Sequence, residues 1–120
     1  MSDEFEKLLR EGLNQLSEGR ISESRDTFLK VIRHSSEIGD RRSLADASSG
    51  LAEAESDIGN LTAAEHIYSN AAELYRELAD SQKLARALHQ QATLLRTLGK
   101  ASEADAAEQE ALSLGVERGA

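Results

Sequence analysis

The segment DIGNLT, at residues 57–62, occurs twice more in looser form, as SEGRIS at residues 17–22 and TLGKAS at residues 97–102. The central glycine of each copy lies forty residues from the next, between two apolar runs with helical spacing. Glycine readily adopts the left-handed backbone conformation that ends many helices, because it has no Cβ atom. The segment therefore predicts a tight turn between two helices, three times in the chain.

A hydroxyl side chain follows each of these turns, at Ser22, Thr62 and Ser102. A hydroxyl at the start of a helix can accept a hydrogen bond from a free backbone N–H. Thr62 and Glu65 also have the spacing of a capping box. We therefore expect the second helix of each pair to begin at the hydroxyl residue.

A second kind of turn lies between the repeats. The stretch EIGDRRSLADA, at residues 37–47, returns loosely as ELADSQKLARA at residues 77–87. Gly39 is expected to end one helix, and either Asp40 or Ser43 to start the next. In the later copy alanine replaces this glycine. Each forty-residue period therefore contains two helices.

The apolar residues between the turns recur with the helical period, and no proline interrupts them. We expect helices at about residues 3–17, 22–38, 42–57, 62–78, 82–97 and 102–114. These form an all-α array of three antiparallel helical hairpins. The whole chain, residues 1–120, is interpreted as a single domain with repeats at about 3–40, 41–80 and 81–115. Hairpins repeated at this period are typical of a solenoid, in which each unit buries its apolar face against its neighbours.

Small and aromatic residues recur at fixed offsets from the three central glycines. A small residue lies seven positions before each glycine, and small or aliphatic residues lie five and twelve positions after it, with an aromatic slot at nine. These residues are Gly12, Ala52 and Ala92; Ser24, Ala64 and Ala104; Phe28, Tyr68 and Glu108; and Val31, Ala71 and Ala111. This pattern resembles the tetratricopeptide repeat (TPR) family, from about Glu4 to Leu114. The forty-residue period resembles the longer variety found in bacterial signalling proteins and Pins-type adaptors. The third unit departs from the pattern, because Glu108 occupies the aromatic slot.

The resemblance implies a right-handed α-solenoid whose first helices line a concave groove, and a non-enzymatic role in protein–protein interaction. The residues expected to face this groove are Leu9, Arg10, Leu13, Asp46, Ser49, Gly50, Glu53, Ser56, Asp57, Arg86, His89, Gln90, Thr93 and Arg96. The main hypothesis is an adaptor that binds a peptide or helix there. The acidic centre of the groove is expected to attract a Lys or Arg of the partner, and the leucines an apolar side chain.

Two alternatives remain open at this point. The chain is also interpreted as a self-associating scaffold, which would make it a homo-oligomer stacked end to end through Leu8, Leu9, Leu13 and the alanine-rich last helix. The segment Ser48–Gly50 places three poor helix formers within one helix. It has two interpretations: close packing against a neighbouring helix, or a floor for a ligand.

Composition and charge exclude several other classes of function. The net charge of −8 disfavours nucleic acid or an anionic membrane surface as a partner. There is no cysteine, and the acidic N-terminal sequence does not resemble a signal peptide, so a cytoplasmic protein is expected. None of the three histidines belongs to a Glu-x-x-His pair or to a His-x-x-x-His pair, and no glycine-rich phosphate loop is present. We therefore expect no enzyme activity, no metal and no cofactor.

Overall fold

The structure is a computed structural model that describes residues 2–119, with side chains described for residues 3–115. The described chain forms six helices and no strand. These helices are α1 (Ser2–Ser17), α2 (Ile21–Ile38), α3 (Arg41–Asp57), α4 (Leu61–Glu77), α5 (Ser81–Thr97) and α6 (Ala101–Gly119). The predicted all-α class and the six helices are confirmed.

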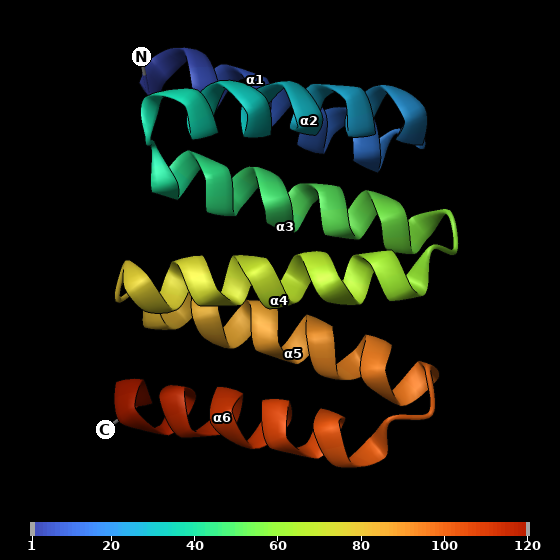
Figure 1. Ribbon diagram of the computed structural model, residues 1–120, viewed down its shortest axis with the longest axis vertical. Coiled ribbons are helices and arrows are strands. Elements are labelled where there is room, and N and C mark those ends of the chain that lie inside the picture. The colour runs from blue at the N-terminus through green and yellow to red at the C-terminus, as the bar shows by residue number, and fades with distance from the viewer. Residues whose placement is uncertain (1, 120) are drawn as a thin grey trace.

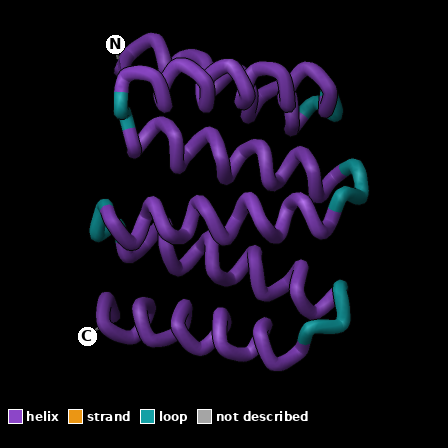
Figure 2. The backbone as a smooth tube through the Cα atoms, viewed as in Figure 1, coloured by secondary structure: helices purple, strands orange, loops and turns teal. Residues whose placement is uncertain are grey.

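The helices stack side by side, with α1 and α2 at one end of the array and α6 at the other (Figure 1). Each helix packs mainly against the helices before and after it in the chain, and α1 also contacts α3. Short turns join consecutive helices alternately at the two sides of the stack (Figure 2). The array therefore consists of three hairpins, α1/α2, α3/α4 and α5/α6.

All five turns share one backbone geometry. In each, a residue with positive φ follows the helix, and the N–H of the next residue donates to a carbonyl five residues earlier, as Asp40 donates to Ser35 at 2.9 Å. This is the Schellman arrangement, which satisfies carbonyls left free at the helix end. Four of the positive-φ residues are glycines, and the fifth is Ala79, with φ of 57°. Ala79 carries a Cβ atom in a backbone region that disfavours it.

The predicted starts of the second to sixth helices lie one residue after those in the structure, but the expected cap residues are correct for only one kind of turn. Asp40 caps α3 by accepting from the N–H of Ser43 at 3.1 Å, and Asp80 caps α5 in the same way. The predicted capping box of Thr62 and Glu65 is absent. The helix begins one residue before Thr62, so the cap position falls on Asn60, whose side chain makes no cap hydrogen bond.

The same shift applies at the other two hydroxyls. Helix α2 begins at Ile21 and α6 begins at Ala101, so Ser22 and Ser102 each lie one residue inside a helix. The carboxylate of Glu65 instead accepts a hydrogen bond from Gln91 of α5 at 2.8 Å, which joins α4 to α5. The hydroxyls therefore do not mark the helix starts.

The aromatic slots of the first two units fill the space between helices. Phe28 is fully buried, and a Cβ atom on Gly12 would lie 2.7 Å from its ring, or 2.4 Å if placed on Gly50. The Phe28 ring therefore fits between α1 and α3 only because both positions are glycine. Close packing explains Gly50 within the unusual Ser48–Gly50 segment. Tyr68 lies in a corresponding cluster with Ala52 and other residues of the second and third units.

The last helix is longer than predicted. The sequence indicated an end near Leu114, whereas α6 continues to Gly119. Gly115 does not stop it, since glycine costs about 1 kcal/mol relative to alanine within a helix but keeps the backbone N–H. Ala104 and Ala111 of α6 are buried, while Leu112 is 61% exposed. The helix thus covers α5 with small side chains.

Candidate partner-binding site

A hollow of about 250 Å³ lies on the face formed by α1, α3 and α5, into which residues of α2 and α4 also reach. It is lined by Leu9, Leu13, Phe28, Asp46, Ser49, Gly50, Glu53, Tyr68, Tyr75, Lys83, Arg86, Ala87 and Gln90. We call this space the hollow. It brings together apolar residues of the first repeat and charged residues of the second and third.

The structure gathers part of the predicted groove at the hollow. The predicted residues that line it are Leu9, Leu13, Asp46, Ser49, Gly50, Glu53, Arg86 and Gln90. Those that do not are Arg10, Ser56, Asp57, His89, Thr93 and Arg96. The predicted set is therefore divided between the hollow and its surroundings.

The predicted residues outside the hollow lie on three helices. Ser56 and Asp57 belong to the last turn of α3, and the others belong to α1 and α5. Arg10 belongs to a shallow polar surface of α1 that also includes Lys7 and Glu11. At the other end of the array, His89 Nδ1 lies 3.0 Å from a carboxylate oxygen of Glu108, and Arg96 forms an ion pair with Asp105 between α5 and α6. These side chains thus hold α6 on α5 rather than lining a cavity.

The apolar side of the hollow belongs to the first repeat. Leu13 is 49% exposed, and Leu9 is half-buried against the cluster that contains Phe28. Leu13 therefore retains apolar surface that binding would remove from water. Truncating it removes little of the core, so its effect on binding can be measured in a folded protein.

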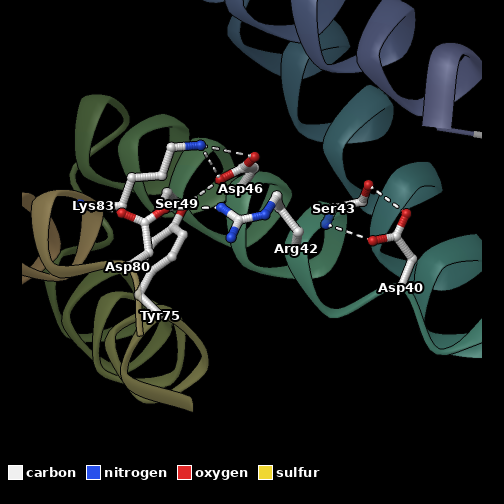
Figure 3. A network of polar contacts seen from close by, with 8 residues as sticks. All are labelled: Asp40, Arg42, Ser43, Asp46, Ser49, Tyr75, Asp80 and Lys83. Carbon is white, nitrogen blue, oxygen red and sulfur yellow. Dashed lines mark hydrogen bonds and ion pairs between the residues drawn. The ribbon is translucent and has the colours of Figure 1, made fainter. Parts of the chain in front are cut away.

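One end of the hollow is closed by a polar network between α3, α4 and α5 (Figure 3). The Tyr75 hydroxyl donates to Asp46 at 2.6 Å, and Lys83 Nζ lies 3.0 Å from the same carboxylate. Arg42 donates to Asp80 at 2.8 Å beside it. Asp46 is therefore already neutralised and hydrogen-bonded within the chain. It offers less to a partner's cation than the sequence indicated.

Two pKa shifts reflect this network. Burial, followed by the hydrogen bond to Asp46, raises the pKa of the Tyr75 hydroxyl. The hydrogen bond from Arg42, with that from the Lys83 N–H, lowers the pKa of the Asp80 carboxyl. At neutral pH the Tyr75 phenol is therefore neutral and can donate, and the Asp80 carboxyl is ionised and can accept.

The opposite end of the hollow carries polar groups without partners among the described residues. Neither Glu53 nor Arg86 forms an ion pair or side-chain hydrogen bond there, and the Tyr68 hydroxyl likewise has no hydrogen-bond partner within residues 3–115. The Tyr68 residue is only 6% exposed, yet it lines the hollow. We call Glu53, Tyr68 and Arg86 the open end of the hollow.

The electrostatics of the open end are dominated by the carboxylates. Burial, and then repulsion from Asp57 one helical turn away, raises the pKa of Glu53, while Arg86 lowers it in part. Burial, and then the charges of Glu53 and Asp57, raise the pKa of Tyr68 to about 12, again offset only in part by Arg86. Burial and the neighbouring carboxylates thus both favour the neutral form of the Tyr68 hydroxyl.

Sequence reasoning missed five residues that line the hollow: Phe28, Tyr68, Tyr75, Lys83 and Ala87. The first three lie on second helices, which were expected to serve only the packing between units. Phe28 and Tyr68 do fill the aromatic slots, and their rings also reach the opposite face. The aromatic slot in the sequence was therefore the signal that could have placed Phe28 and Tyr68 at the hollow. An aromatic side chain is long enough to cross the thickness of such a layer.

The described residues hold no group of three or more His, Cys, Asp or Glu side chains placed to bind a metal ion. Within the same part of the chain, no helix is both long and apolar enough to cross a membrane.

Comparison with protein families decides the identity of the fold. The family model described as tetratricopeptide repeat matches residues 43–114, which is more than half of the chain. The chain belongs to the tetratricopeptide repeat family. No curated protein and no solved structure matches it significantly. The match covers the second and third hairpins of this TPR protein, and the first hairpin has the same helix–turn–helix geometry in the structure. TPR domains generally mediate protein–protein interactions, so a role in binding proteins follows from membership.

Proposed function

We propose that this TPR protein is a non-enzymatic adaptor that binds a peptide segment or helix of a partner protein at the hollow. The observation that carries the proposal is the half-exposed Leu13 beside a cavity of about 250 Å³ on the face of the first helices. The cavity is smaller than the roughly 300–1,000 Å³ of sites for small molecules and cofactors. Its size suits one side chain of a partner segment.

The alternative, end-to-end self-association, has less support. Of the three leucines proposed for stacking, Leu8 and Leu9 pack on the cluster around Phe28, and Leu13 borders the hollow. The outer surface of α1 is polar, and the His89–Glu108 hydrogen bond and the Arg96–Asp105 ion pair occupy the α5/α6 edge. Among side chains 3–115, neither end presents the continuous apolar surface typical of a permanent homo-oligomer interface.

A displayed library of random dodecapeptides, selected on the immobilised protein, provides probes that sample many possible partner segments. Binding of selected peptides is then measured for the parent, Leu13→Ala and Leu29→Ala. Leu29 is a matched control, because it is 45% exposed and lies on α2 outside the hollow. We expect Leu13→Ala to weaken binding about tenfold, or about 1.4 kcal/mol, and Leu29→Ala to leave it within about twofold.

Two results would contradict the proposal. One is equal binding to the parent and Leu13→Ala; the other is a loss caused equally by both leucine variants. A selection that yields no binder above background also counts against a peptide-binding groove. Sedimentation of the parent across a concentration range gives the alternative its own test, since stacking predicts a mass that rises with concentration.

A further inference from the structure

The open end of the hollow holds a hydroxyl group, that of Tyr68, which the packing of the helices does not use. Tyr68 is more than nine-tenths buried, and no described residue bonds to its hydroxyl. Tyr75, the other tyrosine, has the Asp46 carboxylate as its partner. The hydroxyl itself reaches the hollow, since it is not among the fully buried side-chain atoms that lack a partner. A group that enters the hollow can therefore donate a hydrogen bond to it in place of water.

The carboxylates beside Tyr68 point to the charge of the missing partner. Glu53 and Asp57 lie four residues apart on α3, a spacing at which like charges destabilise a helix by a few tenths of a kcal/mol. Burial first, and then repulsion from Asp57, raises the pKa of Glu53. Neither carboxylate has an ion-pair partner among the described side chains. A cation bound here would relieve this repulsion.

The remaining charges of the hollow do not cancel this preference. Lys83 is already paired with Asp46 in the polar network between α3, α4 and α5. Arg86 is exposed, and its single positive charge stands against the two carboxylates of Glu53 and Asp57. The open end therefore attracts a positive group, whereas the neighbouring side of the hollow is apolar, with Leu9 and Leu13.

We propose that the hollow receives one lysine or arginine side chain of a partner segment, whose cationic head contacts Glu53 and Tyr68 while its aliphatic stem lies along Leu9 and Leu13. This rests on the proposed function and specifies it. The head donates to the Glu53 carboxylate and to the hydroxyl oxygen of Tyr68. Long cationic side chains combine an apolar stem with a polar end, which matches a hollow that is apolar at one side and acidic at the other. The apolar anchor and the cation expected from the sequence thus belong to one residue.

The peptides selected on the parent protein test this directly. We expect them to share a Lys or Arg at one position. Replacing that residue with norleucine, which keeps a comparable stem and removes the charge, should weaken binding to the parent at least tenfold. The same replacement should change binding to Glu53→Gln by less than about threefold, because the charge has then lost its partner. Glu103→Gln, an exposed position on α6 outside the hollow, is the matched control and should retain the full tenfold difference.

Tyr68→Phe removes only the hydroxyl and should weaken binding of the basic peptide severalfold, with no effect on the norleucine peptide. The inference is overturned if the selected peptides share no basic residue, or if norleucine costs as much with Glu53→Gln as with the parent. It is also overturned if an acidic or purely apolar residue is the shared feature. In each of these cases a loss caused by Leu13→Ala would still support binding at the hollow. If neither Leu13→Ala nor Glu53→Gln affects binding, the proposed function fails as well.

Discussion

Replacing Gly50 with alanine tests the packing that positions the hollow. The new Cβ atom would lie 2.4 Å from two carbons of the Phe28 ring, whereas carbon atoms in contact prefer about 3.5–4.0 Å. The ring is fully buried and would meet the same restriction at Gly12, so it has nowhere to turn. Overpacking of this kind costs about 1–3 kcal/mol. The better helix propensity of alanine returns about 1 kcal/mol. A contact of 2.4 Å with a confined ring belongs at the upper end of the overpacking range, about 3 kcal/mol. We therefore expect Gly50→Ala to lower the free energy of unfolding by about 2 kcal/mol.

Urea and thermal denaturation followed by circular dichroism provide the measurement. The expected loss corresponds to a fall in Tm of at least about 3 °C. Phe28→Leu should relieve the clash, so the double variant should be at least about 1 kcal/mol more stable than the sum of the single effects predicts. Gly115→Ala is the control, since its Cβ atom meets open space, and it should not destabilise the protein. A Gly50→Ala protein as stable as the parent would refute the reasoning.

Four further predictions concern the turns, the network and the last helix. Ala79→Gly should stabilise the protein by about 0.5–1 kcal/mol because it relieves a positive φ, while Gly39→Ala, in the equivalent turn, should destabilise it by a similar amount; a shared sign would contradict this. Tyr75→Phe should cost about 1 kcal/mol by removing the hydrogen bond to the α3 carboxylate, whereas Tyr68→Phe should stay within about 0.5 kcal/mol in the same denaturation assay; equal losses would show that the Tyr68 hydroxyl has a partner. The folded-state pKa of Asp80 lies below its unfolded value of about 3.9, so its contribution to stability is present above that value and is lost as pH falls below it. Asp80→Asn should therefore flatten the stability profile on the acid side, and an unchanged slope would exclude this role. Hydrogen exchange should be slowest in α3 and α4 and fastest in α6, and equal protection of α4 and α6 would contradict the uneven packing.

The fold was predictable from sequence because the turns use residues that determine backbone geometry. Glycine with positive φ ends four helices, and the carboxylates of Asp40 and Asp80 cap the helices that follow. The error at Thr62 has a physical origin. The residue after the glycine already serves as the helix cap, so the hydroxyl falls within the first turn. Spacing alone does not locate the cap to one residue.

The candidate site was predictable only in part, because a cavity depends on three-dimensional packing. Helical spacing placed the side chains of α3 well, and most of the expected residues there line the hollow. It could not show that Asp46 is neutralised by Lys83, a residue thirty-seven positions away. Nor could it show that His89 is used by the last helix, because Glu108 replaces the usual aromatic residue and lies within 3.0 Å of it. Contacts with side chains distant in the sequence thus determine which polar groups remain free to bind a partner protein.

The most direct test of the central claim is a crystal structure of the protein bound to a peptide selected on it. The account predicts the peptide along the face of α1, α3 and α5, with one Lys or Arg side chain in the hollow and its head within hydrogen-bond distance of Glu53 and the Tyr68 hydroxyl. A peptide bound across α2, α4 and α6, or against the outer surface of α1 or α6 with the hollow empty, would contradict it.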